Sequence, residues 1–278
     1  MTLNEMLTSA FSDAAGLYNA AARGFLVVWL AALPAQLFVL NAPFGRFTPK
    51  SQKWTVDGIK AWMIMESVSP VALLTSYLKH PLSKATPPIA HPATLLVGLY
   101  VAHYANRAII SPLRTPNRSR AHLVIPLAAS LFNTFNGALM GAYLSSSIRP
   151  NLWTSNPLFW PGVALFVLGL AGNIVHDEVL LDLRRSTPHG PDGKPHYAIP
   201  YGWLYRWISY PNYFCEWVEW LGFAIAACPK PTTVAAPWLF FIAEIAVMLP
   251  RALRGHEWYH DKFKDYPRER KAVIPFLL

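Results

Sequence analysis

The feature that most constrains the fold of this chain is a series of seven long apolar stretches, separated by short segments rich in turn residues or charge. The stretches cover about residues 15–40, 59–78, 92–113, 121–147, 158–183, 203–227 and 233–254 of the 278. A helix of roughly 20 apolar residues crosses the hydrocarbon core of a bilayer. Only 14% of the residues are charged, whereas soluble domains carry about 25%. The sequence therefore predicts an all-α, multi-pass membrane protein of seven transmembrane helices, with one domain over residues 1–278.

The connecting segments indicate how the chain is oriented. With seven spans, successive segments alternate between the two sides of the membrane, and the side of the C-terminus carries sixteen Lys and Arg against five on the other. Cytoplasmic segments are enriched in Lys and Arg. We therefore expect a cytosolic C-terminus and a lumenal or periplasmic N-terminus. The membrane is expected to be the endoplasmic reticulum in a eukaryote and the inner membrane in a bacterium.

Polar side chains recur at helical spacing within the apolar stretches. Asn173, Asp177 and Arg184 share one face of the fifth helix, and Asn212, Glu216 and Glu219 share one face of the sixth. A charge at the centre of a membrane helix costs roughly 2.5–3.5 kcal/mol on insertion scales. One interpretation is a set of structural ion pairs between these acids and Arg184, Arg107 and Arg251. The number of buried ions favours a second interpretation, a polar cavity that opens to the cytosol and holds a large anionic ligand.

Several other kinds of site are not expected. The sequence contains no glycine-rich phosphate-binding motif. A metal is not expected, because His176, Asp177 and Glu178 are consecutive and point around their helix, and His256 and His260 lack the glutamate of a zinc-binding helix. Nucleic acid is not expected either, since the basic residues are spread over segments beside the bilayer.

One acid stands apart from the others. Glu66 lies in AWMIMESVSP, with no basic residue within one helical turn on either side. A carboxyl group in apolar surroundings is expected to keep its proton near neutral pH and so to donate a hydrogen bond. The alternative is an acid near a helix end whose head group reaches the membrane interface.

The C-terminal segment HEWYHDKFKDYPRERKAVIPF resembles the closing signature of the steroid 5α-reductase family. Other motifs typical of that family occur in family order, so the resemblance covers residues 40–278. Three positions depart from the pattern: Met65, Ala198 and Gly255 stand where relatives often have Gln, Arg and His. The motifs are APFGRF, AWMIMESVSP, HYANR, FNGALMG, GNIVHDEVLLDLR and YAIPYGWLYRWISYPNYFCEWVEWLG.

The resemblance implies an NADPH-dependent reductase that saturates the C=C bond of an α,β-unsaturated ketone, typically the Δ4 bond of a 3-oxosteroid. In such an enzyme Glu66 and Tyr104 would hold the substrate carbonyl, and Arg118 and Arg120 match a basic loop pair. The residues that would line the NADPH pocket are Asn173, Asp177, Arg184, Tyr197, Asn212, Glu216, Arg251, His256, Tyr259 and Arg270. Relatives that reduce polyprenols or enoyl thioesters remain alternatives, as do membrane methyltransferases, which use S-adenosylmethionine and end in a similar tail.

The implied chemistry needs hydrogen-bond donors at the ketone. Hydride addition to the β-carbon is fast only if the negative charge that grows on the oxygen is stabilised, and each donor in a water-poor site contributes roughly 3–4 kcal/mol. Glu66 and Tyr104 are the expected donors. The apolar, steroid-like substrate is expected to enter from the membrane lipid. The C-terminal tail is expected to cover the cofactor, with Arg270 and Lys271 at its phosphates and IPFLL docked on the bundle or membrane.

Overall fold

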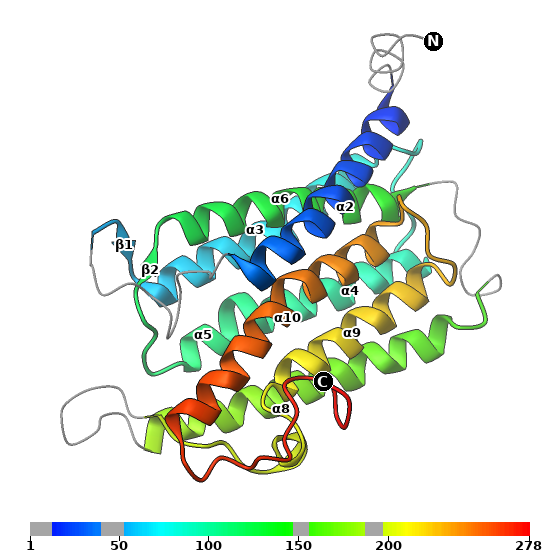
Figure 1. Ribbon diagram of the computed structural model, residues 1–278. Helices are drawn as coiled ribbons and strands as arrows, with labels where there is room; N and C mark the ends of the chain where they lie inside the picture. The colour runs from blue at the N-terminus through cyan, green and yellow to red at the C-terminus, as the bar shows by residue number, and fades with distance from the viewer. Residues whose placement is uncertain (1–12, 40–52, 147–155, 187–196) are drawn as a thin grey trace.

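The computed structural model describes residues 13–39, 53–146, 156–186 and 197–278. Within these ranges the chain is mostly helical (Figure 1). The minor elements are the π-helix η2 (Asn106–Ile110), α5 (Ser111–Arg114), the 3-10 helix η3 (Trp203–Arg206) and the strands β1 (Thr55–Val56) and β2 (Ala121–His122), which pair antiparallel. The long helices are α2 (Ala14–Phe38), α3 (Gly58–Lys79), α4 (Pro92–Ala105), α6 (Val124–Ser145), α8 (Phe159–Ser186), α9 (Pro211–Ala227) and α10 (Ala236–Lys262).

Each predicted apolar stretch overlaps one of these long helices, and three boundaries differ from the prediction. In the third stretch α4 ends at Ala105, and η2 and α5 continue it. The sixth stretch is not one helix from residue 203, because η3 and a short turn precede α9, which begins at Pro211. Proline suits the first turn of a helix, where its missing N–H has no partner to lose. The seventh helix continues to Lys262, beyond the predicted end at 254. Four of the described helices, α2, α6, α8 and α10, are long and apolar enough to cross a membrane.

Two pairs of helices pack at very short range, α3 with α6 and α8 with α9 (Figure 1). Glycines make this approach possible. A side chain at Gly137 of α6 would collide with the Ser69 carbonyl of α3, and one at Gly169 of α8 would collide with the backbone of Glu219 in α9. Small residues at such positions let membrane helices approach until their backbones touch. The close contact between α8 and α9 therefore fixes the position of Glu219 relative to α8.

Aromatic rings join α4, α9 and α10 in the buried interior. The Trp220 ring centroid lies 5.5 Å from that of Tyr100 and 4.5 Å from that of Phe240, and all three side chains are at most 1% exposed. His103 packs edge-on against the same indole, with 4.7 Å between ring centroids. His103 therefore lies at the boundary between the aromatic cluster and the buried polar residues.

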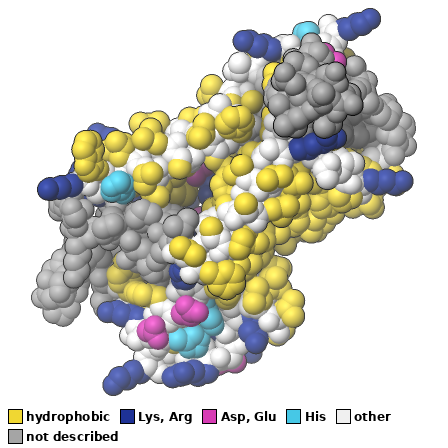
Figure 2. Space-filling view, turned by 45° about the horizontal axis from the view of Figure 1, so that its top comes forward, with side chains coloured by type: hydrophobic (Ala, Val, Ile, Leu, Met, Phe, Trp, Pro, Cys, Tyr) yellow, Lys and Arg dark blue, Asp and Glu magenta, His cyan; other side chains and the backbone are white. Residues whose placement is uncertain are grey.

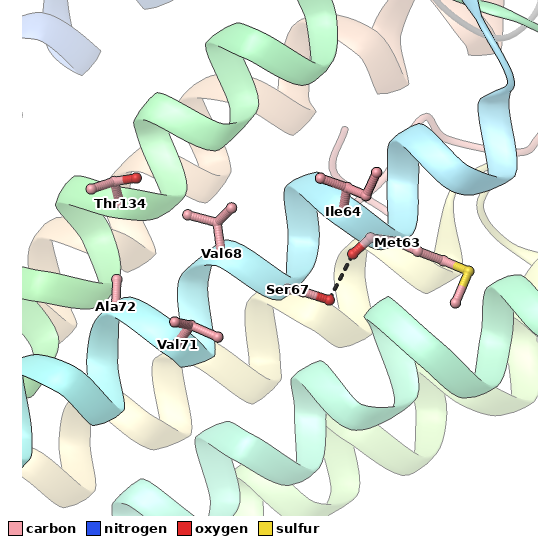
Figure 3. A pocket seen from close by; sticks show the side chains of 7 residues that line it. All are labelled: Met63, Ile64, Ser67, Val68, Val71, Ala72 and Thr134. Atoms are coloured by element: carbon pink, nitrogen blue, oxygen red, sulfur yellow. Dashed lines mark hydrogen bonds between the residues drawn. The ribbon is translucent and has the colours of Figure 1, made fainter.

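The outward faces of the helices are apolar. Ile64 and Val71 of α3, Leu131 of α6 and Leu168 of α8 are each more than 60% exposed. In the view of Figure 2, hydrophobic side chains cover the middle of the molecule, and most Lys and Arg side chains lie toward its ends. A shallow apolar groove of about 590 Å³ lies between α3 and α6 (Figure 3). Such a surface suits contact with hydrocarbon rather than water.

The C-terminal tail docks on the bundle, as predicted, through Ile274 of the IPFLL segment and through Val273, which precedes that segment. Its backbone pairs with the segment before α9, where Ser209 N donates to Lys271 O at 2.9 Å and Tyr210 N donates to Ala272 O at 3.0 Å. Val273 is fully buried against α9 and α10. Phe276 remains 76% exposed, so the docking does not depend on the last apolar residues.

Candidate active site

The polar stripes of α8 and α9 face each other across the close contact between these helices. Asn173 Nδ2 donates to the Asn212 carbonyl at 3.0 Å and to Glu216 Oε2 at 3.2 Å. Asn212 Nδ2 donates to Asp177 Oδ1 at 2.9 Å. Asn173 and Glu216 are almost completely buried. Four of the residues that were expected to line a cofactor pocket therefore form one connected seam.

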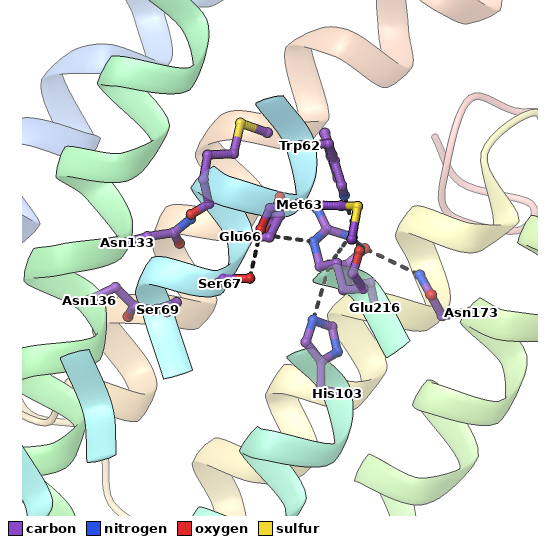
Figure 4. Close-up of polar contacts among 12 residues, drawn as sticks. Trp62, Met63, Glu66, Ser67, Ser69, His103, Asn133, Asn136, Asn173 and Glu216 are labelled. Atoms are coloured by element: carbon purple, nitrogen blue, oxygen red, sulfur yellow. Dashed lines mark hydrogen bonds and ion pairs between the residues drawn. The ribbon is translucent and has the colours of Figure 1, made fainter. Parts of the chain in front are cut away.

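Arg107, in η2, joins this seam to α3. Figure 4 shows Glu66 of α3 together with Glu216 and Asn173 of the seam. Arg107 Nη1 lies 2.9 Å from Glu216 Oε1, and its Nε lies 3.4 Å from Glu66 Oε2. The carboxyl groups of Glu66 and Glu216 are buried, while the Arg107 side chain is 25% exposed. One guanidinium thus bridges the residue expected to hold the substrate and a residue expected to hold the cofactor.

The expectation that Glu66 is an isolated acid was wrong. No base is near it in its own helix, but Arg107 reaches it from the segment that follows α4. A sequence window of one helical turn cannot reveal a partner that tertiary packing supplies. The pairing of Glu216 with Arg107 also matches one of the structural ion pairs considered from the sequence, whereas Asp177 pairs with Asn212 rather than Arg184.

Tyr104 lies on α4, one turn before Arg107, and is 3% exposed. Its ring centroid is 4.8 Å from that of Tyr100, whose hydroxyl lies 2.5 Å from that of Ser69 on α3, one turn from Glu66. Behind it, Asn136 Nδ2 donates to the Tyr100 hydroxyl at 2.9 Å. The two residues expected to hold the substrate carbonyl therefore lie in one buried polar region between α3 and α4.

A second cluster forms where the tail meets α10. The Ser209 hydroxyl lies 2.6 Å from His256 Nδ1 and 2.6 Å from the Tyr266 hydroxyl. The Tyr259 ring stacks on the Tyr266 ring, with 5.1 Å between centroids. Burial raises the pKa of Tyr266, against the lowering effect of its hydrogen bonds, so this hydroxyl stays neutral. His256 and Tyr259 are thus brought together beside the tail.

Arg270 extends the tail cluster. Its Nη1 donates to the Pro200 carbonyl at 3.0 Å, and its guanidinium lies 5.0 Å from the ring centroids of both Tyr201 and Tyr266. The residue is 3% exposed, and its Nε has no hydrogen-bond partner among the described residues. No carboxylate of the described chain lies within ion-pair distance of it. A buried cation of this kind is suited to an anionic ligand.

Gly255 precedes His256 on the tail-facing side of α10. A side chain at this position would collide with the phenol of Tyr210, whose hydroxyl and ring fill the space. The departure from the family pattern at Gly255 therefore has a local steric cause.

The remaining predicted site residues lie around these clusters. Tyr197 is 37% exposed and packs edge-on against Trp258, and Arg251 lies half-buried on α10. Arg120 donates to the carbonyl and hydroxyl of Thr55, so its observed contacts are with β1. Their roles at a cofactor stay predictions.

Arg118 and Arg184 lie near the seam at its exposed end. The Arg118 guanidinium lies 3.6 Å from the centroid of the Trp62 ring. Although the residue as a whole is exposed, its pKa is lowered to about 10, first because the head group is partly desolvated and then because Arg184 and Arg107 repel its charge. Cations that repel one another gain from an anion placed between them.

One buried polar side chain near the site, His103, was not predicted from the sequence. Its Nδ1 lies 2.8 Å from Glu219 Oε1, and both side chains are at most 3% exposed. The signal was present in the HYANR motif, because His103 and Arg107 are four residues apart and therefore share a helix face. Among the described residues, no group of three or more His, Cys, Asp or Glu is arranged to hold a metal ion.

Comparison with known proteins connects this geometry to a family. A family model described as 3-oxo-5-alpha-steroid 4-dehydrogenase matches residues 119–278. The chain is 34% identical over 240 residues to 3-oxo-5-alpha-steroid 4-dehydrogenase 1 of Rattus norvegicus, which covers 86% of this chain and 87% of the relative. It is 34% identical over 280 residues to steroid 5-alpha-reductase DET2 of Solanum lycopersicum, with 96% and 99% covered. It is also 39% identical over 269 residues to an uncharacterized protein of Schizosaccharomyces pombe, with 88% and 94% covered. The family predicted from the motifs is therefore confirmed, and the chain belongs to the 3-oxo-5-alpha-steroid 4-dehydrogenase family of oxidoreductases.

Proposed function

We propose that this protein uses NADPH to reduce the Δ4 carbon–carbon double bond of a 3-oxosteroid to the 5α-product. The observation that carries the proposal is the position of Arg107, which touches both Glu66 and Glu216. A ketone held by Glu66 and Tyr104 would adjoin a cofactor held by the α8–α9 seam. Family membership supports the same reaction, since relatives are named 3-oxo-5-alpha-steroid 4-dehydrogenase and steroid 5-alpha-reductase.

The residues present fit a phosphorylated dinucleotide. Arg270 is buried without an acidic partner among the described residues, and its Nε is unsatisfied. In the seam, Asn212 Oδ1 is also buried without a hydrogen-bond partner. Arg118 and Arg184 add positive charge at the exposed end of the seam. These cations would hold phosphate groups, and the seam amides and carboxylates would hold the ribose or nicotinamide.

NADPH, when bound, supplies the hydride. Tyr104 and protonated Glu66 donate hydrogen bonds to the ketone oxygen, and stabilise the negative charge that grows there as the β-carbon is reduced. Glu216 is the nearer of the two carboxyl groups to Arg107 and supplies the counter-charge of that guanidinium. Protonation of the α-carbon, by water or a side chain, completes the reduction.

We further propose that the seven long helices all span the membrane, with the N-terminus in the lumen or periplasm. The segment after the first span pairs with the segment before α6 through β1 and β2, which supports a shared side for these two basic segments. At the other end, the Tyr18 hydroxyl donates to the Val234 carbonyl at 2.7 Å. Arg and Lys are concentrated on the side of β1, β2 and the tail, which supports a cytosolic position for that side.

The test combines cofactor binding with product analysis. Purified protein is incubated with NADPH and a panel containing a Δ4-3-oxosteroid, a trans-2-enoyl thioester and a polyprenol precursor, and products are identified by mass. We expect the steroid to gain two hydrogens. Glu66→Leu should lower the turnover rate by at least about 100-fold, since it removes one donor to a developing oxyanion and such a donor is worth that much. The rise in melting temperature caused by NADPH should be kept.

Glu178→Leu is the matched control, because Glu178 lies on α8 outside the seam and also pairs with arginines, Arg114 of α5 and Arg185 of α8. It should retain wild-type turnover. A rise in melting temperature with S-adenosylmethionine and none with NADPH would instead favour a membrane methyltransferase. Reduction of the thioester or polyprenol alone would keep the reaction type and replace the substrate.

A further inference from the structure

His103 and Glu219 form a buried pair between α4 and α9 to which the proposed reaction gives no role. His103 Nδ1 lies 2.8 Å from Glu219 Oε1, and the side chains are 3% and 0% exposed. A buried carboxylate without a compensating charge or proton is costly. A hydrogen must therefore lie between Nδ1 and Oε1, which makes the contact a buried hydrogen bond whichever of the two atoms donates.

Both residues of this pair are packed against neighbouring residues. The backbone of Glu219 abuts Gly169 of α8, where no side chain fits. The His103 ring packs edge-on against Trp220, with 4.7 Å between ring centroids, and against Tyr104, at 5.0 Å. Because both side chains are buried in a close-packed interior, the pair sets the spacing between the two helices at this level.

The position of the pair connects the two halves of the site. His103 directly precedes Tyr104 on α4, and Glu219 lies one turn beyond Glu216 on α9. The second ring nitrogen of His103 is 4.0 Å from Glu216 Oε1. After Ala105 the α-helix gives way to the π-helix η2, which carries Arg107. The helical hydrogen bonding changes from the α to the π pattern at that point. A contact between α4 and α9 just before the change therefore helps to set the positions of Tyr104 and Arg107.

We propose that His103 and Glu219 are positioning residues that fix the substrate-holding end of α4 against the cofactor-holding face of α9. The inference rests on the proposed function, in which Tyr104 orients the ketone and Glu216 the cofactor. Misplacement by about 1 Å can cost on the order of 100-fold in rate. Loss of the pair should therefore slow hydride transfer without weakening cofactor binding.

The test uses the full-length protein in detergent. For His103→Ala and Glu219→Ala, we expect the single-turnover rate of steroid reduction per NADPH-binding site to fall on the order of 100-fold, with an unchanged NADPH dissociation constant. Glu219→Gln should recover most of the rate, because its amide oxygen can still accept the hydrogen bond from His103. Hydrogen–deuterium exchange of the cofactor-free protein gives a second readout, since the segment from His103 to Ile110 should exchange faster in the alanine variants.

Tyr77→Phe is the matched control. It removes a different cross-helix hydrogen bond, the 2.8 Å contact between Tyr77 and Thr94 that joins α3 to α4 away from the site. It should change neither the single-turnover rate nor exchange in the His103 segment. The double variant His103→Phe/Glu219→Leu removes both polar groups, leaves no unpaired charge, and serves if a single variant fails to fold.

Slow hydride transfer in the double variant with intact NADPH binding supports the proposal. Wild-type transfer rates in the folded variants would overturn it, and so would exchange that rises equally in Tyr77→Phe. If the wild-type protein reduces no enone with NADPH, the proposed function fails. The exchange experiment would then still decide whether the pair holds α4 in place.

Discussion

The most informative perturbation is at Arg107, because this side chain neutralises buried acids from two helices. Its Nη1 lies 2.9 Å from Glu216 Oε1 and 3.2 Å from Oε2, while its Nε lies 3.4 Å from Glu66. Two unit charges 4 Å apart attract by about 4 kcal/mol at an effective dielectric constant of 20. Desolvation of both groups offsets most of this attraction, so the pair itself adds little net stability.

Removing only one partner of the ion pair has a much larger effect on stability. Arg107→Met leaves the buried Glu216 carboxylate with Asn173 as its closest donor, and breaking a buried pair in this way costs about 3–5 kcal/mol. Glu216→Gln should cost about 1.5–3 kcal/mol, the worth of a hydrogen bond to a charged group. The double variant removes the Glu216 charge together with its partner, so it should be more stable than the sum of the single effects by about 2–3 kcal/mol. The cost of leaving Glu66 without Arg107 is common to Arg107→Met and the double variant and cancels in the cycle.

The assay is reversible unfolding in mixed micelles with increasing sodium dodecyl sulfate, extrapolated to native detergent. The matched cycle is Arg114→Met with Glu178→Gln, whose ion pair is equally short at 2.8 Å but has side chains 48% and 28% exposed. Exposed pairs contribute roughly 0–1 kcal/mol. A coupling at Arg107–Glu216 no larger than that at Arg114–Glu178 would refute the reasoning from burial.

Two further perturbations test the packing that supports the site. Gly169→Val should separate α8 from α9 at Glu219, lower stability by about 1–3 kcal/mol and reduce turnover, whereas Gly24→Val, where an added side chain meets nothing within 4 Å, should leave the melting temperature and turnover unchanged. Val273→Ala removes two methyl groups from a fully buried position, which costs at least about 1.6 kcal/mol at 0.8 kcal/mol per methylene; proteolysis of the tail should accelerate, while truncation of the exposed Phe276 to alanine should have no effect.

The parts of this structure that periodicity controls were predictable, and those that depend on contacts between helices were not. Asn173 and Asp177 are four residues apart, so helical geometry alone placed them on one face. The partner of that face, on α9, followed from the same spacing in Asn212 and Glu216. The Arg107–Glu66 contact, in contrast, depends on how α3 packs against the end of α4, and no local pattern in the sequence encodes it.

The same distinction applies at helix ends and in the tail. Asp57 begins α3 by accepting hydrogen bonds from Ile59 N and Lys60 N, a role that its residue type favours. The turn between η3 and α9 was hidden, because the apolar and aromatic residues of that segment have the composition of a helix. Docking of the tail was expected from its apolar residues, but the choice of Val273 over Phe276 depends on the shape of the bundle surface.

The contact between Gly255 and Tyr210 has a consequence for variation at these two positions. Since the phenol occupies the volume that any side chain at 255 requires, position 255 can gain a side chain only after the residue at 210 has changed or moved. A chain with histidine at 255 must first have a smaller or differently rotated residue at 210, and the backbone of that residue also pairs with Ala272 of the tail. We therefore expect substitutions at 210 and 255 to be inherited together, with the single intermediate surviving only when position 210 becomes small before position 255 becomes large.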